Sequence, residues 1–313
     1  MREKVLEIKG LNKAFGKKKI IHNLNLTVYA GEILGFLGPN GSGKTTTIKM
    51  VMGFLTPDQG EISICGMSVK KNYEEAMGLV GGIVENPEMY IEFTGRKNLE
   101  MYARIHDHVS PEQIEAAVKL VKAESYIDEK VKKYSLGMKQ RLGIAQAVVH
   151  KPRLLVLDEP TNGLDAEGIK ELRDILKKLA HEENVAILVS SHLMSEMELM
   201  CDRVALIDRG MLLEEKEIHE FVSAGAKKYV LLIENPEQAV SLLTNLHVLI
   251  ENVSPCPGDN TKFQAVIHLE QGDAWGLIRR FVQENVALYG VREIENSLED
   301  AYISAVKGVG GNA

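Results

Sequence analysis

Gly38-Pro39-Asn40-Gly41-Ser42-Gly43-Lys44-Thr45 is the stretch that decides the fold of this 313-residue chain. It follows the apolar run Glu32–Leu37 (EILGFL), interpreted as a buried strand, and leads into Thr45–Gly53, interpreted as a helix that ends at glycine. The spacing fits the pattern G-x-x-x-x-G-K-[ST], which requires a strand before it and a helix after it. Backbone N–H groups of such a loop close around phosphates, and the helix N-terminus favours an anion. The stretch therefore predicts an α/β fold with a triphosphate site, in preference to a ligand-free glycine-rich turn.

Each residue type in this loop has a chemical reason. Lys44 can reach the β- and γ-phosphates, and the Thr45 hydroxyl can ligate Mg²⁺. The residues expected to contact the nucleotide here are Gly38, Asn40, Gly41, Ser42, Gly43, Lys44, Thr45 and Thr46.

A second apolar strand, Leu154–Leu157, ends in a pair of acids. Asp158 is expected to join Thr45 in the Mg²⁺ shell. Glu159 is expected to point the other way and accept a proton from the attacking water. Alone, Glu159 would be interpreted as an ordinary capping acid, but beside a phosphate loop the catalytic role is favoured.

The first two thirds of the chain alternate strands and helices, which predicts a largely parallel sheet. Residues from about 95 to 150 look helical instead, with a capping box at Ser110 and a helix over Leu136–Val149. Further along, Asp165 is expected to cap a helix. We therefore expect a nucleotide-binding domain over residues 1–222 with a helical subdomain inserted at about 95–150.

The pattern changes near Phe221, and residues 223–313 are expected to form an accessory α/β domain. Its order is β-α-β-β-α-β, which resembles a ferredoxin-like unit. The strand Val248–Val253 is expected to end in a Pro/Gly-rich turn (SPCPGDN). Trp275 and Phe281 are both expected in the core of this domain.

Composition excludes several classes. The net charge of −7 argues against nucleic-acid binding by bulk electrostatics. No apolar run approaches the roughly 20 residues needed to cross a bilayer, and the first ten residues lack the apolar core of a signal peptide. The 3 cysteines are scattered, so neither a disulfide framework nor a zinc site is expected. We expect the protein to work in a reducing cytosol.

Taken in order, these motifs and five more resemble the ATP-binding subunit of ABC transporters. The signature is Tyr134-Ser135-Leu136-Gly137-Met138-Lys139-Gln140-Arg141, and Asn162-Gly163-Leu164-Asp165 is similar to the D-loop. His192 matches the switch histidine, Phe15 the aromatic that stacks on adenine, and Glu85 the position of the Q-loop glutamine. The resemblance covers roughly residues 1–220.

The resemblance implies ATP hydrolysis with ATP and Mg²⁺. Ser135 and Gly137 would hold the γ-phosphate bound by a second subunit, so that two nucleotides lie in a homodimer or heterodimer. Asp165 would also contact nucleotide, and Glu85 would join the metal site. Lys44, Glu159 and His192 would be the catalytic residues.

Two departures from the family pattern stand out. Leu136 and Met138 replace residues of the usual Leu-Ser-Gly-Gly-Gln, and Glu85 replaces an amide with a carboxylate that donates no hydrogen bond unless protonated. The Glu85 variant and the signature wording are similar to those of bacitracin and lantibiotic resistance exporters of the ABC-2 type. This implies export of, or immunity to, an antimicrobial peptide or similar amphiphile, at the cytoplasmic face of a bacterial membrane.

Transport would require a separately encoded integral-membrane permease, docked around Glu85–Leu99 and the helical insert by family analogy. The alternative is a non-transport ABC ATPase of translation or DNA repair. Two-cassette chains are usual for the first role and a long coiled coil for the second, and neither is seen here. A P-loop GTPase is weaker, because Asn12-Lys13 lacks the aspartate that guanine recognition needs.

Overall fold

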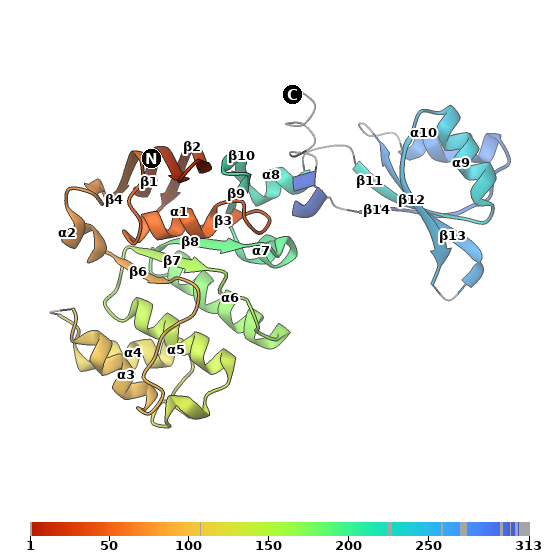
Figure 1. Ribbon diagram of the computed structural model, residues 1–313. Coiled ribbons are helices and arrows are strands. Elements are labelled where there is room, and N and C mark those ends of the chain that lie inside the picture. Colours follow the sequence, from red (N-terminus) through yellow and green to blue (C-terminus); the bar gives the residue numbers. More distant parts are fainter. Residues whose placement is uncertain are drawn as a thin grey trace. The chain divides into compact units, whose positions relative to one another are not determined.

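The computed structural model describes residues 2–106, 108–223, 227–257, 259–269, 274–294, 297–300, 302, 303 and 306. The chain divides into two compact units, Met1–Ile218 and His219–Ala301 (Figure 1), and Tyr302 and Ile303 group with the first. None of the helices in these described ranges is long and apolar enough to cross a membrane.

The elements of the first unit follow one another along the chain. They are β1 (Lys4–Phe15), β2 (Lys18–Tyr29), β3 (Ile33–Leu37), α1 (Lys44–Val51), β4 (Gln59–Ile64), β5 (Met67–Ser68), α2 (Tyr73–Met77), β6 (Val80–Ile83), α3 (Gly95–Ala103), α4 (Pro111–Leu120), the 3₁₀ turn η1 (Val131–Lys133), α5 (Leu136–Val148), β7 (Leu154–Asp158), α6 (Ala166–His181), β8 (Ala186–Ser191), α7 (Met194–Met200), β9 (Arg203–Asp208) and β10 (Met211–Glu217). A short helix, α8 (Ile218–Ser223), lies at the junction with the second unit.

A six-stranded sheet in the order β10-β9-β3-β8-β7-β6 forms the centre of this unit. All neighbouring pairs are parallel except β10 with β9. Every residue of β3, β7 and β8 is buried, as expected for strands covered on both faces. Since the strands are parallel, β3, β7 and β8 bring their carboxyl ends to one edge.

A second, antiparallel sheet has the order β2-β1-β4-β5. Figure 1 shows α1 between the two sheets and α6 on the opposite face of the six-stranded sheet. Ile48, Met50 and Val51 of α1 share one apolar core with residues of both sheets. The predicted strands over residues 5–8 and 24–28 are confirmed but run longer, because register shifts beyond Ile8 interrupt their alternation without ending the pairing.

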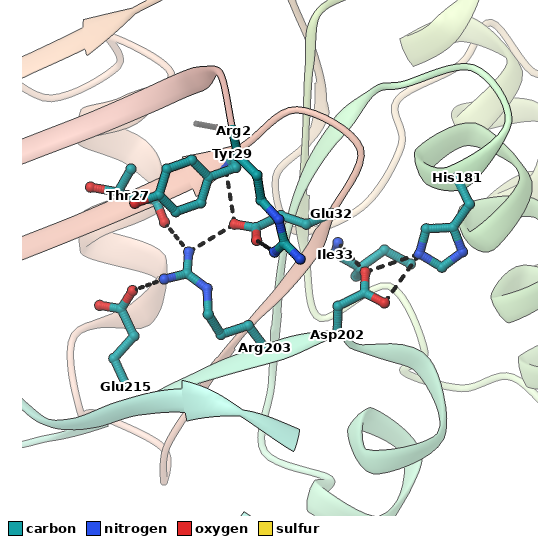
Figure 2. Close-up of polar contacts among 9 residues, drawn as sticks. All are labelled: Arg2, Thr27, Tyr29, Glu32, Ile33, His181, Asp202, Arg203 and Glu215. Carbon is teal, nitrogen blue, oxygen red and sulfur yellow. Dashed lines mark hydrogen bonds and ion pairs between the residues drawn. The ribbon is translucent and has the colours of Figure 1, made fainter. Parts of the chain in front are cut away.

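A polar network joins the two sheets at the amino end of β3 (Figure 2). Arg203 donates to Glu32 Oε1 at 2.7 Å, to the Thr27 carbonyl at 2.5 Å and to Glu215. Glu32 is 3% exposed in its side chain and also accepts from the Tyr29 backbone N–H at 2.8 Å. The network therefore lies opposite the edge that carries the phosphate loop.

The segment between the adjacent strands β6 and β7 contains α3, α4, η1 and α5. The predicted capping box at Ser110 is confirmed, with Ser110 Oγ and Gln113 each bonded to the other's backbone N–H. The predicted helix over Leu136–Val149 is confirmed as α5, and Asp165 caps α6 as predicted.

The second unit contains β11 (Lys227–Ile233), α9 (Pro236–Asn245), β12 (Leu249–Cys256), β13 (Asp259–Leu269), α10 (Ala274–Gln283) and β14 (Leu288–Ile294). Its antiparallel sheet has the order β12-β13-β11-β14, and α9 and α10 pack on it through a core of their own. Phe281 is fully buried as predicted, but the prediction for Trp275 is wrong because its side chain is 73% exposed. Leu277 and Phe281, four residues apart, form the buried face of α10, and Trp275 lies outside it.

Candidate nucleotide-binding and catalytic site

The loop of residues 38–43 connects β3 to α1 and is shaped by its glycines. Gly41 and Gly43 have φ values of 81° and 110°, which side chains other than hydrogen rarely allow. A Cβ added at Gly38 would lie 2.1 Å from the Ile207 carbonyl oxygen, so only glycine fits there. The sequence spacing thus becomes a tight turn whose backbone leads directly into a helix N-terminus.

Lys44, the first residue of α1, lies across this turn with only 5% of its side chain exposed. Its ammonium group donates to the carbonyls of Gly38, at 2.8 Å, and Pro39, at 3.3 Å. The same group is 3.3 Å from Glu159 Oε1. A buried positive charge therefore lies between the phosphate loop and the acid at the end of β7.

Glu159 is the centre of the predicted catalytic group. Its φ of 51° turns the chain immediately after β7, and its backbone N–H is held by the carbonyl and the hydroxyl of Ser190 on β8. Its second oxygen, Oε2, lies 2.5 Å from His192 Nδ1. The structure thus brings Lys44, Glu159 and His192 together from three separate segments.

Asp158 is the last residue of β7 and is 3% exposed. Ser190 Oγ donates to Asp158 Oδ1 at 2.6 Å across the parallel pair β7–β8. Ser190 therefore contacts both acids, and the sequence reasoning missed it. The signal available was its position at the carboxyl end of a predicted buried strand, where a hydroxyl is otherwise costly.

The donor set fits the Mg²⁺ that the family implies. The described residues hold no group of three or more His, Cys, Asp or Glu side chains suited to a metal. Mg²⁺ commonly takes only one or two protein oxygens and completes its shell with phosphate and water. Thr45 on α1 and Asp158 could supply such oxygens, and the buried Ser42 Oγ in the adjoining loop has no hydrogen-bond partner within the described ranges.

Glu85 lies just beyond β6 and is not in contact with the group formed by Lys44, Glu159 and His192. Its carboxylate pairs with Lys49 of α1 at 2.7 Å, and its side chain is 64% exposed. The hydrogen bond from Lys49 lowers the pKa of the Glu85 carboxyl. Glu85 is therefore held as a carboxylate on the edge that carries Asp158, since β6 and β7 are parallel neighbours.

Ser135, Gly137 and Asp165 form a second group. Ser135 caps α5 by accepting from the Met138 backbone N–H at 3.2 Å, and Asp165 caps α6 by accepting from that of Gly168 at 2.9 Å. All three line one cavity of about 500 Å³ between the two helices. Two helix N-termini, each favourable to an anion, therefore lie on one surface.

Phe15 belongs to neither group. It ends β1, its ring is 53% exposed, and the Lys13 ammonium lies 5.6 Å from the ring centroid. An exposed aromatic face is suited to stacking on a base.

The chain is an α/β protein whose phosphate loop, buried aspartate and adjacent glutamate are arranged as expected for nucleotide hydrolysis. Residues 21–162 match the family described as ABC transporter. The chain is 43% identical over 300 residues to the uncharacterized ABC transporter ATP-binding protein YhcH of Bacillus subtilis (strain 168), covering 96% of this chain and 95% of that protein.

It is also 38% identical over 304 residues to the bacitracin transport ATP-binding protein BcrA of Bacillus licheniformis, covering 97% of this chain and 98% of that protein. A solved structure of an ATP-binding subunit of an ABC transporter matches with a TM-score of 0.63 and 27% identity, over 69% of this chain and 91% of the other. The chain belongs to the family of ABC transporter ATP-binding proteins, which hydrolyse ATP.

Proposed function

We propose that this chain is the ATP-hydrolysing subunit of an export complex at the cytoplasmic face of a bacterial membrane, working with separately encoded permease subunits. The observation that carries the proposal is the convergence of Lys44, Glu159 and His192 beside the buried Asp158. Glu159 acts as general base toward the attacking water, and His192 fixes the orientation of its carboxylate through the 2.5 Å contact. Lys44 neutralises charge on the terminal phosphates.

Thr45 and Asp158 would hold Mg²⁺, which when bound supplies positive charge opposite the phosphate oxygens. Ser190 keeps Asp158 and Glu159 in a fixed relation, since it bonds to the first through its hydroxyl and to the backbone of the second. Glu85 would also join the metal site, and its pairing with Lys49 supports this only by keeping the side chain in the ionised form that can ligate a metal. The base of the nucleotide would stack on Phe15.

Ser135, Gly137 and Asp165 would face the nucleotide of a second subunit, in a homodimer or a heterodimer. Their shared cavity wall supports this, because a site built on two helix N-termini and open on one side can be completed by another subunit.

The two domains have different roles in this proposal. Residues 1–222 act as the nucleotide-binding domain, with residues of about 95–150 as an inserted helical subdomain. Tyr90, Ile91 and Phe93, which are 63%, 53% and 44% exposed, support permease docking on the adjoining segment 85–99. Residues 223–313 form an accessory module, and the order β12-β13-β11-β14 supports a ferredoxin-like assignment.

The test of the hydrolytic site is Glu159→Gln. The variant should bind ATP normally and lose about 10²–10⁴-fold in kcat, the usual contribution of a general base. Lys44→Ala should abolish binding or turnover, and Glu183→Gln, an exposed acid beyond α6, serves as the matched control. Unchanged turnover in Glu159→Gln would assign the base to another residue.

The exported substrate is tested by expression with the permease. We expect protection against bacitracin or a lantibiotic, in view of the relationship to a bacitracin transport protein, and no protection with Glu159→Gln. Full sensitivity to every peptide of both kinds would exclude this substrate class and leave the ATPase assignment standing.

A further inference from the structure

The signature helix α5 and the D-loop helix α6 are separated over their first turns by the cavity of about 500 Å³. The side chains on its wall are incompletely paired: within the described part of the chain, the buried atoms Gln140 Oε1 and Arg141 Nε have no hydrogen-bond partner. The two helices therefore do not pack closely here, and their relative position depends on the few side chains that cross between them.

One bridge is apolar and lies at the helix N-termini. Leu136, one of the two residues that depart from the family signature, lies over Gly163 of the D-loop. A Cβ added to Gly163, whose φ is 75°, would be 2.5 Å from Leu136 Cδ2. Leu136 is 44% exposed, so the contact with the D-loop covers only part of its side chain.

The other bridge is ionic and lies further along both helices. Arg141 of α5 donates to Glu171 of α6, and the two side chains are 24% and 26% exposed. The Arg141 guanidinium also lies 5.6 Å from the ring centroid of Tyr126 in the helical segment. A half-buried, charge-assisted bond of this kind is stronger than an exposed ion pair.

We propose that Leu136 and the Arg141–Glu171 pair are positioning residues that make the signature and the D-loop move as one body. The inference rests on the proposed function, in which both surfaces face the nucleotide of a second subunit. Fixing one surface relative to the other raises the fraction of molecules ready to close on that nucleotide, and the apparent affinity rises with that fraction.

Hydrogen exchange of the full chain tests the coupling directly. Arg141→Glu should speed amide exchange by about tenfold in both residues 136–144 and residues 162–170, the change expected when a bond to a charged group is lost. Arg141→Glu/Glu171→Arg should restore protection in both segments. Faster exchange in α5 alone, or failure of the double variant to restore the D-loop, would overturn the proposal.

Steady-state ATP hydrolysis provides the second readout. Arg141→Glu and Leu136→Ala should raise the KM for ATP by about three- to tenfold with a much smaller change in kcat, because the competent fraction falls while the reacting groups stay in place. Leu136→Met, which can keep the contact, should behave as the unchanged chain. A loss confined to kcat would contradict a positioning role.

Arg153→Glu is the matched control, since Arg153 forms an ion pair with Glu3 at 2.7 Å away from both helices. It should alter neither exchange in the two segments nor the KM. If the unchanged chain proves unable to hydrolyse ATP, the proposed function fails, whereas the exchange experiment still decides whether the two helices are coupled.

Discussion

At the scale of single residues, the position of Glu159 depends on a backbone conformation that few residues other than glycine adopt. Its φ of 51° turns the side chain out of the direction of β7 and toward Lys44 and His192. Two hydrogen bonds from the Glu159 backbone N–H, to the carbonyl and the hydroxyl oxygen of Ser190, hold that turn. The strained residue and its support therefore occur at the residue proposed as the general base.

Ser190→Ala should lower kcat by about 10–100-fold and raise the Mg²⁺ concentration needed for half-maximal activity. The reason is that the serine supports Asp158 and Glu159 without touching substrate. Titrating Mg²⁺ at saturating ATP measures both effects. Ser191→Ala is the control, since that hydroxyl accepts from the Leu193 backbone N–H instead. Equal effects in the two variants would argue against a specific role for Ser190.

His150 makes stability depend on pH. It is half-buried, stacks on His106 at 4.0 Å between ring centroids, and bonds to the Val80 carbonyl. Burial, together with His106, lowers the pKa of His150 from 6.5 to about 4. Between pH 6.5 and about pH 4, His150 is therefore protonated in the unfolded chain but neutral in the folded chain. Its contribution to the free energy of unfolding is complete above pH 6.5 and is lost as the pH falls toward 4.

His150→Gln keeps a donor for the Val80 carbonyl but cannot be protonated. Between pH 7.5 and pH 5, the melting temperature of this variant should fall by about 2–4 °C less than that of the unchanged chain. The difference is small because solvent screens part of the penalty for charging a half-buried group. Parallel melts at the two pH values measure this. Identical losses would mean that other groups determine the acid sensitivity.

At the scale of elements, a fully buried strand was easier to predict from the sequence than the end of an edge strand. The continuous apolar run of Leu154–Leu157 predicts a buried strand, and the structure confirms it as part of β7, in which every residue is buried. The predicted turn after Val253 is partly wrong, since β12 continues to Cys256 and Pro255 pairs with Phe263. β12 is an edge strand, and a proline that cannot donate is tolerated there.

The network around Arg203 gives a prediction at this scale (Figure 2). Arg203→Met should destabilise the chain by about 3–5 kcal/mol, because Glu32 would remain buried without its main partner. Arg203→Met/Glu32→Leu should recover most of the loss. Denaturant titration measures both, and Arg209→Met, with its side chain 88% exposed, is the control; a loss below about 1 kcal/mol would place this pair with ordinary surface ion pairs.

At the scale of the whole molecule, the chain has separate cores for its two units. The residues proposed as catalytic all belong to the first unit, and the core of the second is formed by its own sheet and helices. Stability and hydrolysis should therefore be separable by mutation.

Phe281→Ala should lower one of two calorimetric transitions, at a cost of about 3–5 kcal/mol for a fully buried ring, and leave ATP hydrolysis unchanged. Leu34→Ala, in the core of the first unit, should lower the other transition and reduce hydrolysis at elevated temperature. A single cooperative transition shifted equally by both variants would show that the units do not fold independently.

The phosphate loop, the buried strand ending in Asp158-Glu159 and the helix starts at Ser110 and Asp165 could be predicted from sequence alone, because each depends on residues within a dozen positions of one another. The family could be predicted as well, because several such local motifs follow one another in a fixed order. Four features became visible only in three dimensions: Ser190 contacts both acids, Glu85 pairs with Lys49, Leu136 lies on the D-loop and Trp275 is exposed. These features depend on which strands become neighbours and which helix face meets the sheet. That choice is made by packing between distant segments, and local sequence patterns do not encode it.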